Sequence, residues 1–170
     1  MRESLRELNA LIWSVHPDND TLPSLADFIA NFASRYLGAA GIELELDLPE
    51  QIPATPIPSR LRHELAAMFK EALRNVTQHS HAKRVVVRLR IDASRLVLSV
   101  RDDGRGFDSS TRRQSSQRDQ GEDARTLDSE GNGLRNFQAR SEHLGGHCRI
   151  QSAPDQGTEV EFDVPLDLAD

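Results

Sequence analysis

Residues 85–106 read VVVRLRIDASRLVLSVRDDGRG, in which two apolar runs lead into Asp102-Asp-Gly-Arg-Gly106. Val85 to Arg90 and Leu96 to Val100 are rich in β-branched and long apolar residues, which predicts two strands. Asp102 then lies just past the second strand, and two glycines follow it. A carboxylate there can accept a hydrogen bond from an exocyclic amino group such as that of adenine, while glycines let the backbone approach a ligand. The alternative is a tight Asp/Gly hairpin turn, and this segment alone does not decide between the two.

A second motif lies upstream, in residues 61–79, which have a helical period. Its expected core stripe is Leu65, Phe69, Ala72 and Val76. Glu71 and Asn75 are four residues apart, so they should project side by side from one edge of this helix, with His79 one turn further on. A Glu can take up a proton there, and an Asn oxygen suits Mg²⁺. The alternative is a solvated helix face, which leaves the glycine motifs unexplained.

The third motif is Gly131-Asn-Gly-Leu134, which precedes a helical pattern from about Leu134 to His143 that Gly145-Gly146 closes. Glycines at a helix start leave backbone N–H groups free to face an anion such as a phosphate. A plain N-terminal loop is the alternative. The segment matches neither the Walker pattern nor the dinucleotide-binding fingerprint.

The rest of the chain predicts further helices and strands. A helix is expected over Leu22 to Gly38, with Leu25, Phe28, Ile29, Phe32 and Tyr36 on its apolar side, followed by a strand over Ile42 to Leu48. Pro49 to Pro58 holds four prolines and is expected to be a loop. With a helical pattern over Met1 to Val15, the predicted order is α, α, β, α, β, β, α, β, β.

The motifs in this order, followed by Gly157-Thr158 before a final strand, resemble the GHKL ATPase superfamily. From about Leu22 to the C-terminus, the chain is similar to the catalytic and ATP-binding domain of bacterial two-component sensor histidine kinases, especially the nitrate-sensor-like class. The resemblance implies an α/β (α+β) fold of the Bergerat type. This fold is a two-layer sandwich of a mixed sheet with helices on one face.

The resemblance also implies roles for the matching residues, with ATP and Mg²⁺ as the ligands. Glu71 would be the catalytic base that polarises or deprotonates the attacking histidine of a partner domain. Asn75 would ligate Mg²⁺, and Asp102 would recognise the adenine amino group. The other ATP-binding residues would hinge the lid, contact phosphates or line the nucleotide pocket: His79, Gly104, Gly106, Gly131, Gly133, Leu134 and Thr158.

Two features depart from this family pattern. Gln78 stands where many members carry a Lys or Arg, and Arg74, Arg135 or an arginine of the lid could supply that phosphate-facing charge. The segment of about residues 107–131 is long and rich in polar and charged residues. We interpret it as an extended ATP lid, with a disordered surface insertion as the alternative.

The phosphate acceptor of this family is a histidine on a separate helical dimerisation domain. Residues 1–21 are interpreted as the end of that domain's helix and a linker, and residues 22–170 as the catalytic domain. His63 lies on the helix of Glu71 and Asn75, so it cannot be the acceptor. The chain is therefore expected to be a catalytic fragment, unable to autophosphorylate alone. Its expected partners are the histidine-containing dimerisation domain of the parent chain and the receiver domain of a response regulator.

Composition limits the other functions. The formal net charge of −6 argues against nucleic acid or an anionic membrane as a partner. A single cysteine excludes an internal disulfide and suits the cytosol. No apolar run is long enough to cross a membrane, so we expect a cytoplasmic fragment without direct membrane contact, compatible with a parent anchored in the inner membrane. Two alternatives remain open, an anti-sigma-type protein serine kinase and a degenerate, non-catalytic nucleotide-binding module.

Overall fold

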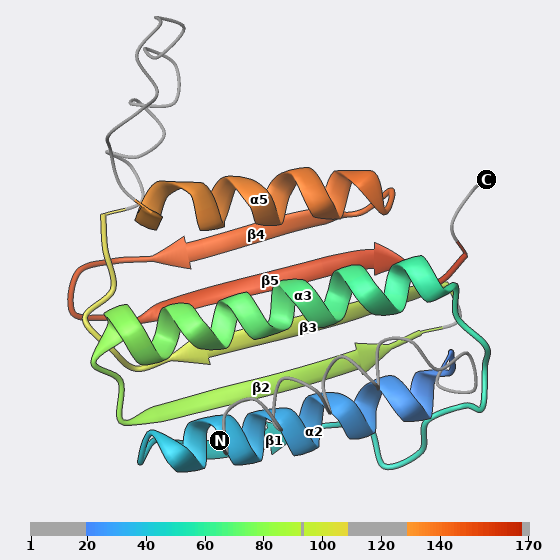
Figure 1. Cartoon of the computed structure of the whole chain (residues 1–170), viewed down its shortest axis with the longest axis horizontal. Helices are drawn as coiled ribbons and strands as arrows, with labels where there is room; N and C mark the ends of the chain where they lie inside the picture. The colour runs from blue at the N-terminus through green and yellow to red at the C-terminus, as the bar shows by residue number, and fades with distance from the viewer. Residues whose placement is uncertain (1–19, 93, 109–128, 168–170) are drawn as a thin grey trace, which may run out of the picture.

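The computed structural model describes residues 20–92, 94–108 and 129–167. Its elements follow the chain in this order (Figure 1): α2 (Leu22–Ala39), β1 (Glu43–Asp47), α3 (Ser59–Asn75), the π-helix η2 (Val76–Ser80), β2 (Arg84–Ile91), β3 (Arg95–Asp102), α5 (Ser129–His143), β4 (His147–Ser152) and β5 (Thr158–Pro165). The predicted order is confirmed from Leu22 onward. The helix expected over Met1 to Val15 lies outside the described residues.

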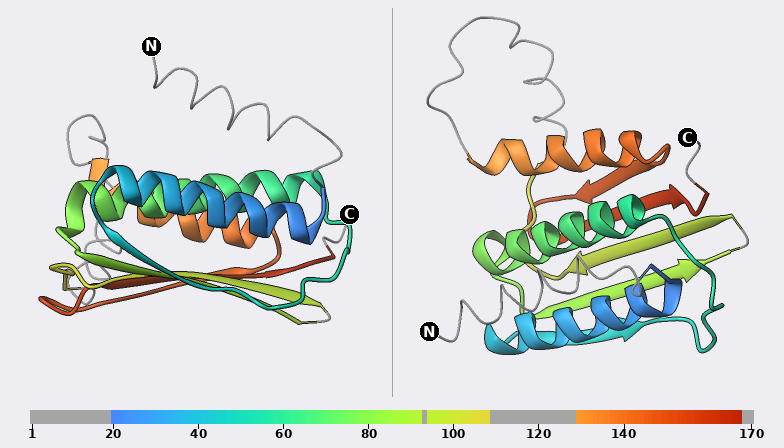
Figure 2. Two further views of the ribbon diagram at one scale, coloured as in Figure 1. Left: turned by 90° about the horizontal axis from the view of Figure 1, so that it is seen from below. Right: turned by 45° about the vertical axis from the view of Figure 1, so that its right-hand side comes forward.

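The strands form one mixed sheet in the order β1-β2-β3-β5-β4. β1 runs parallel to β2, and every other neighbouring pair is antiparallel. Figure 2 shows α2, α3 and α5 packed side by side against one face of this sheet. The predicted two-layer α/β sandwich with helices on one face is thereby confirmed.

The core lies between the two layers. The whole predicted stripe of α3 is buried, with Leu65 and Phe69 fully inaccessible to solvent. Facing them, every second residue of β2 and β3 is buried, as expected for strands that are covered on one face only, and Ser99 of β3 is buried in addition. On α5 the ring of Phe137 packs edge-on against Phe162 of β5 at a centroid distance of 5.2 Å. Burial of these apolar side chains is the main force that holds the helices on the sheet.

The opposite face of the sheet is charged rather than covered. Basic side chains of the adjacent strands β2 and β3 lie there between acidic side chains of β1 and β5, and they pair across the strands. Arg88 and Arg90 both donate to Asp47, at 2.7 and 2.6 Å, and these hydrogen bonds lower the pKa of Asp47 to about 2. Polar alternation of this kind lets one sheet face remain in water.

Two helix boundaries differ from the sequence-based expectation. The helix expected to continue to His79 is α-helical only to Asn75, and a π-helical turn follows. The Ser80 hydroxyl donates to the Val76 carbonyl at 2.8 Å, the acceptor that the Ser80 amide would use in an α-helix. Helix α5 begins at Ser129, before the glycines that were expected to precede it. Its end matches the expectation, because Gly145 takes a left-handed φ of 69° there.

No helix within the described ranges has both the length and the apolar character that a membrane crossing requires.

Candidate functional site

Asp102 is the last residue of β3 and is 5% exposed. Its Oδ1 accepts a hydrogen bond from the Gly104 amide at 2.8 Å, and the Thr158 amide also donates to this carboxyl. Burial raises the pKa of Asp102, and the two backbone donors only partly offset that effect. A desolvated carboxylate at a strand end suits a ligand that brings its own hydrogen-bond donor.

The adjacent Asp103 has a structural role. Its Oδ1 accepts hydrogen bonds from the amides of Lys83 and Arg84, at 2.8 and 2.9 Å. These donors lower the pKa of Asp103, and they tie the turn after β3 to the start of β2. Of the two consecutive aspartates, Asp102 therefore belongs to the site and Asp103 to the framework.

The glycines that follow are required by close backbone contacts. A Cβ on Gly104 would lie 2.2 Å from the Ser80 carbonyl oxygen. Gly106 has a φ of 56°, and a Cβ there would lie 2.0 Å from the Ala153 carbonyl oxygen. The turn consequently packs against η2 on one side and against the β4–β5 connection on the other.

Hydroxyl groups continue the site onto the neighbouring strands. Thr158, the first residue of β5, pairs with Asp102 in the sheet. Its Oγ1 lies 3.0 Å from the Ser152 hydroxyl, which also donates to the Gly157 carbonyl and accepts from the Phe107 amide. Ser152 thus joins the segment after the glycines to the two C-terminal strands.

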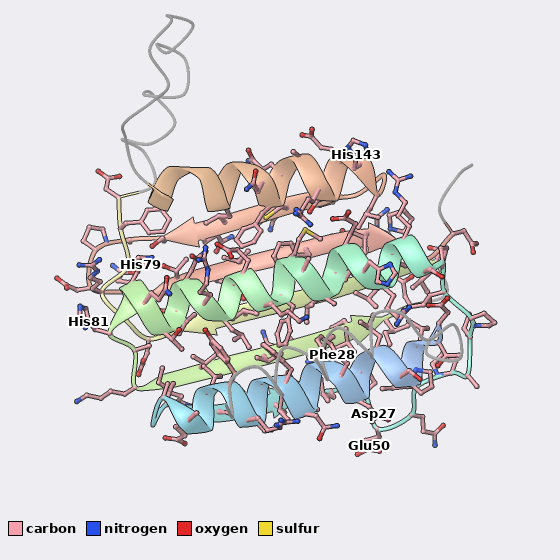
Figure 3. All side chains as sticks on the ribbon, in the orientation of Figure 1. Asp27, Phe28, Glu50, His79, His81 and His143 are labelled. Atoms are coloured by element: carbon pink, nitrogen blue, oxygen red, sulfur yellow. The ribbon has the colours of Figure 1, made fainter. Side chains whose placement is uncertain are left out.

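These residues surround a cavity of about 280 Å³ between the end of α3 and the sheet. Its lining includes five of the predicted site residues: Asn75, His79, Asp102, Gly106 and Thr158. Figure 3 shows His79, in η2 just after α3, far from His143 at the end of α5. Seven further residues complete the lining: Ala72, Val76, Ser80, Val100, Arg105, Phe107 and Val160. An apolar cavity with a few polar groups fits a planar heterocycle with one recognised edge.

Glu71 lies beside this cavity rather than in its lining. A Cβ on Gly133 would lie 3.2 Å from Glu71 Oε1 and 3.6 Å from Asn75 Nδ2, so the first turns of α5 run close to both side chains. Glu71 is held by Arg74, whose Nη2 and Nε donate to its two oxygens at 2.6 and 2.9 Å. The predicted Glu and Asn are therefore brought together with the predicted glycine segment.

The remaining predicted residues are placed only by their backbone. Gly131 and Leu134 belong to the first turns of α5, and the Leu134 side chain lies outside the described part of the structure. Gly104 does not line the cavity but supports Asp102 through its amide. Most of the expected lid, residues 109–128, also lies outside the described residues.

Sequence reasoning missed Ser80, Arg105 and Phe107. Arg105 and Phe107 flank Gly106, a predicted site residue, so their position in the sequence could have identified them. A search for characteristic residue types does not use that position. Ser80 had no such signal, because its carbonyl reaches the Arg105 amide, at 2.8 Å, only through the tertiary fold.

The side chains also limit how a metal could be held. Among the described residues, no group of three or more His, Cys, Asp or Glu side chains could bind a metal ion. Asn75 provides one amide oxygen at the cavity edge. This sparse donor set fits Mg²⁺, which keeps several waters and takes further ligands from phosphate oxygens.

Comparisons with known proteins agree with this geometry. The family model described as "Histidine kinase-, DNA gyrase B-, and HSP90-like ATPase" matches residues 61–168. The sensor histidine kinase LiaS of Bacillus subtilis is 27% identical over 164 residues, which cover 96% of this chain and 40% of LiaS. The sensor protein VraS of Staphylococcus haemolyticus is 25% identical over 178 residues, covering the whole chain and 43% of VraS. The chain thus spans about two fifths of the length of these relatives.

Solved structures show the same fold. The blue-light activated histidine kinase of Erythrobacter litoralis EL346 superposes with a TM-score of 0.60 at 21% identity, covering 84% of this chain and 42% of that chain. The Acinetobacter baumannii histidine kinase AdeS gives a TM-score of 0.57 at 15% identity, covering 86% of this chain and 66% of that chain. The family model spans well over half of the chain and includes every predicted site residue. This chain therefore belongs to the histidine kinase-, DNA gyrase B- and HSP90-like ATPase family.

Proposed function

We propose that this chain is the ATP-binding catalytic domain of a sensor histidine kinase. In this role it transfers the γ-phosphoryl group of ATP to a histidine on a dimerisation domain, from which a response regulator receives it. The observation that supports this most strongly is the buried carboxyl of Asp102 on a mostly apolar cavity whose edge is bordered by Glu71 and Asn75. The adenine amino group would donate to Asp102, and the ring would lie against Val100 and Val160.

The reaction requires positioning and charge compensation more than covalent help from the protein. An imidazole nitrogen of the acceptor histidine attacks the γ-phosphorus, a new N–P bond forms, and the bond to the β-phosphate oxygen breaks to release ADP. Glu71 orients the imidazole and accepts the proton from its N–H group. Asn75 would hold Mg²⁺, which neutralises phosphate charge when bound. Gly133 places the first turns of α5 beside Glu71 and Asn75, and the free amides of a helix start suit phosphates.

Further assignments concern the segments around the ATP site and a longer parent protein. We propose that residues 1–21 form the end of a dimerisation helix with its linker, that residues 107–131 act as a lid over ATP, and that the domain works in the cytoplasm. The sensor kinases LiaS and VraS match this chain over about two fifths of their length, which supports a longer parent with further domains.

Calorimetry with ATP and Mg²⁺ tests the site. Wild type should bind ATP, and Asp102→Asn should lose binding while it remains folded, because the Asn oxygen would stay with the Gly104 amide and its NH2 group, a donor, would face the adenine amino group. Asp155→Asn is the matched control: it removes the same charge from an exposed turn, at a φ of 60° that Asn tolerates, and should bind like wild type. A folded wild type that does not bind ATP would contradict the proposal.

Phosphoryl transfer tests the catalytic role separately. With a supplied dimerisation domain and radiolabelled ATP, Glu71→Gln should keep ATP binding but lose transfer by roughly 10² to 10⁴ in rate. Transfer at the wild-type rate would exclude Glu71 as the base. ATP binding without transfer by any variant, wild type included, would instead identify a non-catalytic nucleotide-binding module.

A further inference from the structure

Arg74 holds the carboxylate of Glu71 from the solvent side of α3. The contact is bidentate, with Nη2 donating to Oε1 at 2.6 Å and Nε donating to Oε2 at 2.9 Å. Both oxygens of the carboxylate therefore carry a hydrogen bond from one planar guanidinium. Such a two-point contact fixes the orientation of the carboxylate as well as compensating its charge.

The fold does not depend on this pair. The two side chains are three residues apart on one helix, and they are 51% and 28% exposed. Exposed pairs of this kind contribute little to the free energy of unfolding. The neighbours of Glu71, rather than the stability of the fold, therefore indicate the function of the pair.

Glu71 faces the region where a triphosphate would end. Its Oε1 lies next to Gly133 in the first turns of α5, and Asn75 follows one helical turn along the same edge. An uncompensated carboxylate in this position repels a triphosphate, and the repulsion is strongest for the γ-phosphate, which comes nearest. Gln78, one turn beyond Arg74, is neutral and does not offset this charge.

We propose that Arg74 is a positioning residue, the counter-ion that orients and neutralises Glu71 so that a nucleoside triphosphate can bind beside it. Arg74 acts through Glu71 rather than by touching the phosphates. The inference rests on the proposed function, because it places the γ-phosphate of ATP next to Glu71.

Calorimetric titration with ATP and with ADP tests this assignment. Arg74→Gln should weaken ATP binding roughly three- to tenfold, the range for a unit charge a few ångströms away in a well-solvated site, and should weaken ADP binding less. The ratio of ATP to ADP affinity should therefore fall. Arg74→Lys keeps the charge and should retain most of the ATP affinity, although it loses the planar two-point contact.

A double-mutant cycle separates action through Glu71 from direct contact with phosphate. In a Glu71→Gln background there is no carboxylate left for Arg74 to orient, so Arg74→Gln should weaken ATP binding clearly less than it does in wild type; only the water-screened charge of Arg74 itself still acts there. Equal effects of Arg74→Gln in both backgrounds would show that Arg74 acts on the nucleotide independently of Glu71, and would overturn the proposal.

Arg140→Gln is the matched control. Arg140 of α5 pairs with Glu64 near the other end of α3 at 2.8 Å, and its exposure of 46% resembles that of Arg74. This variant loses the same charge and an ion pair of the same kind, so its ATP to ADP ratio should equal that of wild type. An unchanged ratio in Arg74→Gln would overturn the inference while leaving the proposed function intact. Failure of wild type to bind ATP would reject the proposed function itself.

Discussion

Asp102 and Thr158 face each other across β3 and β5, and the Thr158 amide donates to the Asp102 carboxyl. The Gly104 amide donates to the same carboxyl from the other side of the strand end. Within the described part of the chain, Asp102 has no ion pair. Main-chain groups alone therefore orient this carboxylate, and its charge is left for a ligand.

The burial that prepares Asp102 for a ligand should destabilise the empty protein at neutral pH. Burial raises the pKa of Asp102 in the folded protein above the ordinary value of 3.8, so the folded protein binds this proton more tightly than the unfolded chain does. The stability that protonated Asp102 contributes is fully present below pH 3.8 and is lost as the pH rises through the raised pKa. Asp102→Asn cannot ionise and should escape this loss.

The measurement is a series of thermal melts without nucleotide, from about pH 3.5 to 7.5, on wild type and Asp102→Asn. The difference in Tm, variant minus wild type, should increase with pH through the raised pKa and then level off. Any lost hydrogen bond adds a constant offset and does not change this slope. A difference that is independent of pH would show that folding does not perturb Asp102.

Gly106→Ala should remove stability and ATP binding together. The φ of 56° is unfavourable for alanine, and the new Cβ would lie 2.0 Å from the Ala153 carbonyl oxygen. We expect a loss of about 1–3 kcal/mol in the free energy of unfolding, measured in urea. Gly38→Ala in α2 is the control, because its Cβ would meet nothing within 4 Å; it should stabilise the protein by up to about 1 kcal/mol. Equal effects of the two substitutions would refute the steric argument.

Much of the fold could be predicted because its signals are local. The stripe of α3 that was expected to form the core is buried, and the alternation in β2 and β3 matches a sheet covered on one face. The layer order came from the family resemblance, since periodicity cannot state which strands are neighbours. Composition alone likewise could not show that the uncovered sheet face carries cross-strand ion pairs such as Arg95 with Asp163 at 2.6 Å.

The site was predictable where its residues form motifs. It was not predictable where the tertiary structure determines the local geometry or the hydrogen-bond partners of a residue. The π-helical turn after Asn75 depends on a hydroxyl bond from Ser80, which a pattern of apolar residues does not register. The different roles of Asp102 and Asp103 depend on which backbone amides donate to each carboxylate. Arg74 could be named from the sequence as a nearby charge, but its bidentate contact with Glu71 required the side-chain geometry.

Ser152→Ala should weaken the site through the segment that Ser152 holds. Its hydroxyl accepts from the Phe107 amide at 2.9 Å and donates to the Gly157 carbonyl at 3.0 Å. Removal leaves both groups without this partner, so we expect a loss of about 1–3 kcal/mol in unfolding free energy and weaker ATP binding. Ser94→Ala, at an exposed hairpin position, should stay within about 0.5 kcal/mol of wild type. Unchanged ATP binding in a destabilised Ser152→Ala would show that the hydrogen bond from Phe107 to Ser152 is not needed to shape the ATP site.

The ion pair between Arg62 and Asp20 provides a contrasting test, because it is buried and far from the cavity. Arg62 is 1% exposed, and its Nε lies 2.6 Å from Asp20 Oδ1, although the N–H group is not aligned on that oxygen. Ser59, in the first turn of α3, also donates to Asp20. Asp20 precedes α2, so the pair fixes the start of α2 against the start of α3. The thirteen residues from Arg62 to Asn75 place it about 20 Å from the site.

Asp20→Asn should lower the free energy of unfolding by about 1–3 kcal/mol, since it leaves a buried guanidinium beside a neutral amide. Asp20→Asn combined with Arg62→Met should lose less than the sum of the single changes, because methionine needs no counter-ion. Arg140→Gln, which breaks the exposed pair with Glu64, should lose less than about 1 kcal/mol. Urea unfolding measures wild type, both single changes, the double variant and Arg140→Gln, and calorimetry should find ATP affinity unchanged wherever the domain remains folded. A loss of ATP binding in folded Asp20→Asn would show that the start of α3 is mechanically coupled to Glu71 and Asn75, contrary to this expectation.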